Sequence, residues 1–458
     1  MTRSIAAAAA AAAAGLLLLT PGPGLATSLP QRTFAVTTDA TGPSTDGAVS
    51  MDGSAIALVS SGNVFVSSVL TGASSLVSVG LGGAPANGPS GAPAISGDGS
   101  AVAFASAASN LTTAGGNGTN QIYVRGAAAG IEPVSVAADG GLANGPSSQP
   151  AISADGRYVA FASTATNLVA GDRNGASDIF VRDRLTRTTI RVSVAHGGVE
   201  ANGPSTTPAI SGNGRVVSFA SSATNLAGGA RGGGVFVRIP STDATELVSV
   251  STRGQPENAG VTKPFTQISS LSLDGRLVAF DSNATNLVSG EDPRPRTNVF
   301  VRDRRRHTTN LVSQDNAGYE GNNDSFAPFI TPSGLYVTFE SFARNLAPGG
   351  GPRENVFVRD VNLRTTSVVN VTQAGGAPGP EIGGELLERP TLSTDGSVAT
   401  FTSTAARLTG NASGVPEVFL RLMTPPRGFL RGAVTTGRRP QVSVGADDPG
   451  ATSFECRV

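Results

Sequence analysis

The sequence is poor in the residues on which many enzymes and disulfide-rich domains depend. It has one cysteine, Cys456, so an internal disulfide and a cysteine-based metal cage are both excluded. Tryptophan is absent, His196 and His307 are the only histidines, and Lys263 is the only lysine. Stability must therefore come from packing, and catalysis by histidine has few candidates.

Charge of one sign is also lacking. The formal net charge is +0 and only 14% of residues are charged. No overall field then attracts nucleic acid or an anionic membrane surface. We expect no nucleic-acid partner.

The only long hydrophobic run lies at the start of the chain. It extends from Ile5 to Leu19, follows Arg3 and precedes helix breakers and a small residue, Ala26. This order is typical of a signal peptide, and the run is shorter than the roughly 20 residues that span a bilayer. We predict a signal peptide over residues 1–26 and a mature protein that is secreted or lies in the cell envelope, extracellular or periplasmic. No membrane insertion is expected after cleavage.

Glycine and proline, by contrast, are abundant, with 59 and 29 residues, and 39% hydrophobic content is enough for a core. A turn of the form Asp-Gly or a close variant recurs seven times. The spacing is nearly constant, from 46 (98 − 52) to 62 (395 − 333) residues. A recurrence at fixed period indicates a repeat architecture. The turns are Asp52-Gly53, Asp98-Gly99, Asp155-Gly156, Asn213-Gly214, Asp274-Gly275, Ser333-Gly334 and Asp395-Gly396.

Each repeat contains four short segments typical of strands. A "PAIS"-like segment precedes the turn, a segment with alternating Val and Phe follows it, and then come "DIFVR"-like and "TIRVSVA"-like segments. Four short strands with Gly, Pro, Asn and Asp at the connections are typical of one propeller blade. A ring of such blades can bury faces that a single blade leaves exposed.

The N-terminal segment "RTFAVTTDATGPS", residues 32–44, aligns with "TIRVSVAHGGVEANGPS", residues 189–205. It would supply the fourth strand that the last repeat lacks. The prediction is an all-β, seven-bladed β-propeller over residues 27–423 with the N-terminal strand closing the last blade; six or eight blades are the alternative. Residues 424–440 are interpreted as a linker, and residues 441–458 as a partial immunoglobulin-like segment or a disordered tail.

The pattern "PAISADGRYVAFAS" followed by "DIFVRD" resembles the TolB-like β-propeller repeat, with its Ser-x-Asp-Gly turn and following V-x-F strand. The resemblance covers residues 32 to about 423 and implies the propeller fold. It implies little about function. The N-terminal domain of TolB has no counterpart here, so the role and partner of that protein are not carried over.

Several polar residues recur in step with the repeat and are therefore interpreted as structural. Arg182-Asp183 has counterparts in later repeats, and an Asn before Leu recurs at the corners. One stretch, "GDRNGASD", offers oxygen atoms at Asp172, Asn174 and Asp178, which would suit calcium. The equivalent stretches lack this acid pattern, so a solvated turn is favoured and no metal or other cofactor is expected.

A binding site, if present, is expected in loops that depart from the consensus. Tyr319, Glu320 and Asp324 form the most suggestive group, since Tyr319 is the only tyrosine outside a predicted strand. No catalytic residue stands out. The function predicted is an exported, non-catalytic, monomeric propeller that binds an unknown protein or glycan at the cell surface. The alternative is a secreted hydrolase or lyase that uses carboxylates in the channel.

Overall fold

The fold was analysed in a computed structural model that describes residues 32–36, 43–126, 130–228, 230, 232–258, 267–290, 294–350, 354–372, 390–405, 408 and 415–423. The predicted signal peptide, linker and C-terminal tail lie outside these residues. Within them, no helix is both long and apolar enough to cross a membrane.

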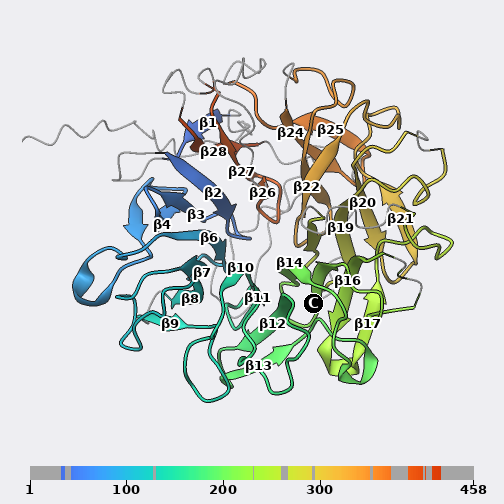
Figure 1. The fold of residues 1–458 in the computed structure, drawn as a ribbon. Helices are drawn as coiled ribbons and strands as arrows, with labels where there is room; N and C mark the ends of the chain where they lie inside the picture. Colours follow the sequence, from blue (N-terminus) through green and yellow to red (C-terminus); the bar gives the residue numbers. More distant parts are fainter. Residues whose placement is uncertain are drawn as a thin grey trace, which may run out of the picture.

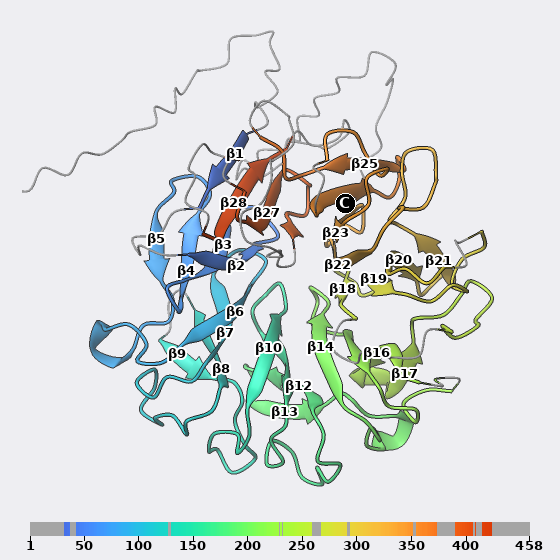
Figure 2. The same ribbon diagram turned by 45° about the horizontal axis from the view of Figure 1, so that its top comes forward.

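Seven antiparallel sheets of four strands each form a ring (Figure 1), which confirms the seven-bladed prediction. We number the blades along the chain: blade 1 is β2 to β5, blade 2 is β6 to β9, blade 3 is β10 to β13, blade 4 is β14 to β17, blade 5 is β18 to β21, blade 6 is β22 to β25, and blade 7 is β26 to β28 with β1. The first strand of each blade faces the centre of the ring, as Figure 2 shows for β2, β6, β10 and β14.

The strand bounds follow the repeat. Innermost strands are β2 (Ser44–Val49), β6 (Ser90–Ile95), β10 (Ser147–Ile152), β14 (Ser205–Ile210), β18 (Ser269–Leu271), β22 (Ser325–Ile330) and β26 (Thr391–Leu392). Second strands are β3 (Ala55–Ser60), β7 (Ala101–Ser106), β11 (Tyr158–Ser163), β15 (Val217–Ser221), β19 (Leu277–Ser282), β23 (Tyr336–Ser341) and β27 (Val398–Ser403).

Third strands are β4 (Asn63–Ser68), β8 (Gln121–Gly126), β12 (Asp178–Asp183), β16 (Gly234–Ile239), β20 (Asn298–Asp303), β24 (Asn355–Asp360) and β28 (Glu417–Leu422). Outer strands are β5 (Ser74–Leu76), β9 (Ile131–Pro133), β13 (Thr188–Arg191), β17 (Ala244–Leu247), β21 (Thr308–Leu311), β25 (Thr365–Val368) and β1 (Arg32–Ala35). Three short 3-10 helices, η1 (Leu81–Gly83), η2 (His196–Gly198) and η3 (Pro240–Thr242), lie in connections.

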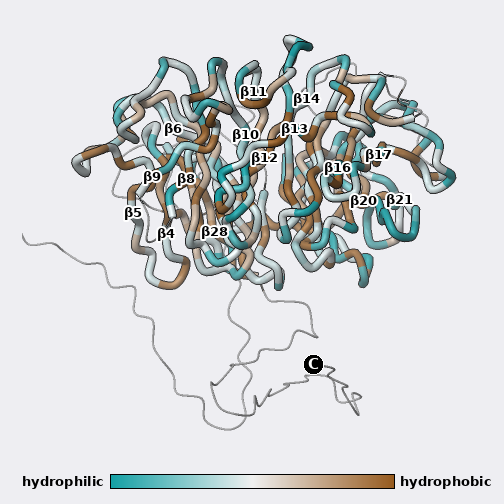
Figure 3. Tube along the Cα trace, turned by 90° about the horizontal axis from the view of Figure 1, so that it is seen from below, coloured by the Kyte–Doolittle hydropathy of each residue, from teal (hydrophilic) through white to brown (hydrophobic). Residues whose placement is uncertain are grey.

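The core lies between blades. In six blades an aromatic residue of the second strand stacks on one of the third, as Phe161 does on Phe180 with ring centroids 5.8 Å apart. Small residues such as Ala160 occupy the other face of the second strand and are fully buried. They let the next blade approach closely. Figure 3, an edge-on view, shows hydrophobic strands inside the disc.

The Ser-x-Asp-Gly turns are built by one hydrogen-bond pattern. In blade 3, Ser153 Oγ donates to Asp155 Oδ1 and accepts from the backbone N–H of Tyr158. Gly156 has a φ of 70°, a conformation that glycine adopts without a side-chain clash. The recurrence of Asp-Gly in the sequence therefore marks a backbone requirement.

Backbone hydrogen bonds join these seven turns into a closed ring around the centre. Each turn donates to the carbonyl of the next, as Gly97 N does to Ala154 O at 2.9 Å. The ring closes where Thr394 N donates to Met51 O at 2.8 Å. Pro332 has no N–H, and there the side chain of Ser333 donates to Thr394 O instead. We call the side of the disc that carries these turns the turn face.

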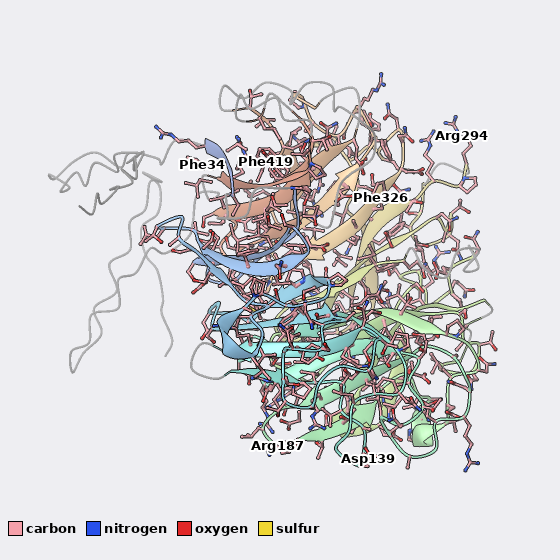
Figure 4. The ribbon with its side chains drawn as sticks, turned by 60° about the vertical axis from the view of Figure 1, so that its left-hand side comes forward. Phe34, Asp139, Arg187, Arg294, Phe326 and Phe419 are labelled. Carbon is pink, nitrogen blue, oxygen red and sulfur yellow. The ribbon has the colours of Figure 1, made fainter. Side chains whose placement is uncertain are left out.

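The N-terminal strand closes blade 7, as the alignment of residues 32–44 predicts. β1 pairs antiparallel with β28, with Phe34 opposite Leu420, and Figure 4 shows Phe34 beside Phe419. Thr33 Oγ1 donates to Val371 O of blade 6 and accepts from Arg421. Thr366 makes the same two bonds in blade 6, to Gln314 O and from Arg359. The strand therefore reproduces the chemistry of a regular outer strand.

The connection from each outer strand to the next blade forms a small loop, which we call a finger. In five of them an isolated bridge closes the base, as between Val194 and Glu200. The finger of blade 4 lies on the outer strand of blade 5, where Thr309 N donates to Thr252 Oγ1. Fingers thus cover strand edges that would otherwise offer unpaired backbone groups.

Candidate functional site

The recurring arginines each bond an outer strand, either of their own blade or of the preceding one. Arg302 Nη1 donates to Ser251 O in the finger of blade 4 and to Thr309 Oγ1 in its own blade, each at 3.1 Å. Burial lowers the pKa of Arg302, an effect that nearby Glu246 and Asp303 oppose. Equivalent arginines occur at Arg125, Arg182, Arg238, Arg359 and Arg421. The structural interpretation of this position is confirmed.

The aspartates that follow these arginines are also structural. Asp303 receives a bidentate pair of bonds from Arg276 and two backbone bonds from the turn after β20. These bonds, with Arg276 first, lower the pKa of Asp303 to about 2. Asp183 is held in the same way by Arg157. The carboxylates of Asp183 and Asp303 are thus paired with arginines of their own blades.

The corner asparagines have the predicted role as well. Asn167 Oδ1 accepts from Asn144 N at 2.9 Å, and its amide nitrogen donates to Leu142 O. Asn144 in turn bonds Thr166, so the finger and the corner hold each other. The same reciprocal pair recurs at Asn110, Asn225, Asn286 and Asn345.

Two acids of the stretch at residues 171–178, which the sequence predicts to be a turn rather than a calcium loop, form a cluster with a third carboxylate that the sequence did not indicate. Oxygen atoms of Asp172, Asp178 and Glu200 lie within 4.8 Å of one another. Glu200 comes from the finger of blade 3 and is distant in sequence. The stretch at residues 171–178 therefore does not include it. The spacing between Asp172 and Glu200 matches no metal-binding loop.

A guanidinium, Arg191 at the end of β13, lies among these carboxylates. Its Nη1 lies 3.2 Å from Asp172 Oδ1, 3.5 Å from Asp178 Oδ2 and 2.5 Å from Glu200 Oε1. The Asp178 side chain is fully buried and also accepts from Ser193 Oγ. The guanidinium of Arg191 thus lies among the three carboxylates, where a bound cation would lie.

Asn174 directs its amide nitrogen, not its oxygen, toward the carboxylate cluster. Its amide nitrogen donates to Asp178 Oδ2 at 2.8 Å and to Ala201 O, while its oxygen accepts from Ala176 N. The Asn-Gly turn favoured from sequence is present, but the carboxylates of Asp172 and Asp178 are not solvated, because both side chains are almost fully buried beside Arg191.

The electrostatics of the cluster are uneven. Burial raises the pKa of Asp172 and of Asp178, and in Asp172 the neighbouring carboxylate of Asp178 adds to the effect. The pKa of Glu200 is lowered, first by the backbone N–H of Arg173 and also by Arg191. Three acids share one guanidinium, so the two aspartates retain protons more readily than free carboxyl groups do.

The three residues of the predicted ligand loop lie near one another in sequence but have different surroundings. Tyr319 is 71% exposed at the finger of blade 5. Glu320 accepts from Asn298 at 2.8 Å, and Asp324 Oδ1 accepts from Thr297 N at 2.9 Å. Glu320 and Asp324 thus contribute to the fold, and Tyr319 is the member available to a ligand. Ligand binding by this loop stays a prediction.

The loop around Tyr319 is less irregular than its sequence suggests. Gln314 and Glu320 form the same isolated bridge that Val194 and Glu200 form in blade 3.

Both histidines lie in exposed turns. His196 is 87% exposed, and its ring nitrogen contacts Asp243 at 3.1 Å. His307 ends the turn between β20 and β21 with a φ of 55°. Neither histidine lies in the carboxylate cluster.

Sequence reasoning also missed a partly buried glutamate, Glu257, in the finger of blade 4. It accepts from Ser282 and from Gln267, whose Nε2 lies 3.2 Å from both carboxylate oxygens. Burial is the first cause that raises its pKa. Two departures from the repeat could have indicated it in the sequence. Only blade 4 begins its third strand with glycine, Gly234, and blades 2 and 3 have alanine, Ala143 and Ala201, where blade 4 has Glu257.

Comparison with known proteins supports the fold only. No family model matches the chain, and no curated protein matches it. The oligogalacturonate lyase in complex with manganese is similar over 85% of this chain and 93% of its own, with a TM-score of 0.51 and 11% identity. TolB from Acinetobacter baumannii is similar over 72% of this chain and 63% of its own, with a TM-score of 0.38 and 16% identity. In architecture the chain is a seven-bladed β-propeller, and its Ser-x-Asp-Gly turns resemble those of the TolB-like repeat.

Proposed function

We propose that this TolB-like β-propeller is an exported, non-catalytic binding module for a protein or glycan at the cell surface. The observation that carries the proposal is that, within the described residues, the recurring polar side chains make hydrogen bonds inside the fold. The recurring arginines, the aspartates after them and the corner asparagines all hold blades, turns or fingers together. Exposed large side chains that differ from blade to blade, such as Tyr319, Leu185 and Leu363, lie on fingers and outer turns.

The export part of the proposal depends on residues 1–26, whose order of charge, apolar run and small residue is that of a signal peptide. A mature protein with a single cysteine does not rely on disulfides in an oxidising compartment. Its stability there would come from the aromatic stacks between strands and from the ring of turn hydrogen bonds.

A second candidate, a secreted hydrolase or lyase, has one observation in its favour. Asp172, Asp178 and Glu200 converge, and paired carboxylates are the machinery of glycoside hydrolysis. Arg191 argues against it, because its guanidinium already contacts all three acids. Asp178 is also fully buried.

The test uses mature protein, residues 27–458, immobilised for capture from envelope extract and on a glycan array, with heat-denatured protein as the control. The expected result is retention of a defined protein or glycan, weakened by Tyr319→Ala, and no depolymerisation of polysaccharides. Polysaccharide cleavage lost in Glu200→Gln but not in Glu132→Gln would instead establish the enzyme.

A further inference from the structure

The outer rim of blade 5 carries positive charge from two segments that are distant in sequence. The turn between β20 and β21 contains Arg304, Arg305, Arg306 and His307. The finger of blade 4 contains Arg253, and the bond between Thr309 N and Thr252 Oγ1 fixes that finger beside the same outer strand.

Three of these arginines are exposed and only weakly neutralised. Arg253 and Arg305 are exposed, and Arg306 is 75% exposed with a distant contact of 3.9 Å to Asp303. Asp303, the only acid among residues 251–255 and 302–308, already receives the bidentate pair from Arg276. Arg304 is paired with Glu246 and is not counted.

Other blades do not repeat this pattern at the same turn. Where blade 5 has Arg305 and Arg306, blade 3 has Leu185 and Thr186, and blade 6 has Asn362 and Leu363. Leu185 and Leu363 are exposed large hydrophobic residues, 72% and 62%. Their absence at blade 5 removes the apolar anchor that protein interfaces usually centre on.

The outer rim of blade 4 differs from that of blade 5 because its cations contact an acid. At blade 4 the finger residue His196 contacts an acid, Asp243, which in turn accepts from Arg238. Arg187 of blade 3 projects outward at its own turn (Figure 4), with Leu185 beside it in the chain. Residues 251–255 and 302–308 at the rim of blade 5 therefore combine several cations with no exposed large hydrophobic residue.

We infer that the outer rim of blade 5, through Arg253, Arg305 and Arg306, binds the carboxylate groups of an acidic polysaccharide. Guanidinium groups bind carboxylates in planar, charge-assisted pairs, and a convex polar rim can contact a chain without a pocket. The inference rests on the proposed function and names the class of its ligand.

The test measures binding of mature protein to immobilised alginate at low salt, with neutral dextran and poly-glutamate as the other probes. We expect binding to alginate that weakens as salt rises, none to dextran, and weaker binding to poly-glutamate. The triple variant Arg253→Ser, Arg305→Ser, Arg306→Ser should bind alginate roughly tenfold less tightly.

The matched control is Arg187→Ser, Arg215→Ser, Arg364→Ser, which removes the same charge from other turns and should retain binding. Equal loss in both variants, no binding of alginate by the unaltered protein, or poly-glutamate bound as tightly as alginate would overturn the inference. If the triple variant still captures its partner from envelope extract, the inference fails while the proposed function stands.

Discussion

Blades 3 and 4 satisfy the same buried hydroxyl from different segments. In blade 3, Ser193 donates to Asp178 at the start of the third strand. In blade 4 that strand starts with Gly234, and Ser249 bonds Glu257 from the finger instead. A side chain on Gly234 would lie 2.6 Å from Ser249 Oγ and 3.1 Å from Glu257 Oε1. What the repeat keeps is therefore an interaction, and the residue that supplies the acceptor can change.

Blade 5 shows a third version of the corner. Asn298 replaces Asp178 and accepts from Ser313, and its amide also donates to Glu320. Leu311 stands where blade 3 has Arg191. The neutral amide needs no guanidinium, whereas the buried aspartate of blade 3 does. In blade 3 the negative charge of Asp178 on the third strand is thus matched by the positive charge of Arg191 on the outer strand, and blade 5 has neither charge.

The largest effect is expected from giving blade 4 the acid of blade 3. Gly234→Asp should destabilise the protein by about 4 kcal/mol, because the new side chain overlaps Ser249 and Leu247 and places a second carboxylate beside Glu257. Urea unfolding would measure this. Gly130→Asp, at a glycine with open space around it, is the matched control and should change stability little.

A double variant sharpens the same comparison. Glu257→Ala together with Gly234→Asp gives blade 4 the acid and the small finger residue of blade 3, although Leu247 still stands where blade 3 has Arg191. The second change removes the competing carboxylate and should recover part of the loss, so the two changes should not be additive. Additive losses would contradict the view that the two positions exchange one role.

The next effect comes from removing the guanidinium of blade 3. Arg191→Leu copies blade 5 but leaves Asp172, Asp178 and Glu200 without their shared cation, which should cost about 3 kcal/mol. The loss should be smaller at pH 5 than at pH 8, because protonation relieves the repulsion. Thermal unfolding at both pH values measures it.

The double variant Arg191→Leu, Asp178→Asn is the control, since it copies both residues of blade 5. It should be more stable than Arg191→Leu alone. A single variant as stable as the unaltered protein at pH 8 would show that the cluster needs no counter-charge.

These comparisons also explain what could be read from the sequence. The blade number and the closing strand could be predicted because Asp-Gly turns and alternating strands are local patterns with a fixed period. Glu200 and Glu257 could not, because each reaches its partners through a finger that crosses to another segment. The role of Arg191 depended on the same crossing. Tyr319 could be singled out because exposure follows from its place between strands.

A smaller effect is expected from the pH dependence of blade 4. The side chains that contact Glu257, namely Ser249, Gln267 and Ser282, are neutral, and burial raises its pKa. An acid whose pKa is higher in the folded state stabilises that state below its unfolded pKa, and the stability is lost as pH rises through the folded pKa. The unaltered protein should therefore lose stability with rising pH relative to Glu257→Gln.

Thermal unfolding of both proteins from pH 4.5 to pH 9 measures the difference, and Glu246→Gln, whose carboxylate pairs with Arg304 outside this corner, is the matched control. Another carboxylate lies close by in the chain, because Asp281 precedes Ser282. It accepts from the backbone N–H groups of Ile268 and Ala327. Parallel curves for the unaltered protein and Glu257→Gln would mean that Glu257 is ionised without cost.

The smallest effect concerns calcium at the cluster of blade 3. Calcium takes 6 to 8 oxygen ligands, and here Arg191 already contacts all three carboxylates while Asn174 directs its nitrogen toward Asp178. Millimolar calcium should therefore raise the melting temperature of the mature protein by less than about 1 °C, since a ligand stabilises the native state in proportion to its affinity. Asp172→Ala should not change that response. In Arg191→Leu the guanidinium is gone and the three acids remain, so calcium should stabilise this variant more than the unaltered protein. A large calcium response in the unaltered protein, abolished by Asp172→Ala, would show instead that the ion displaces Arg191.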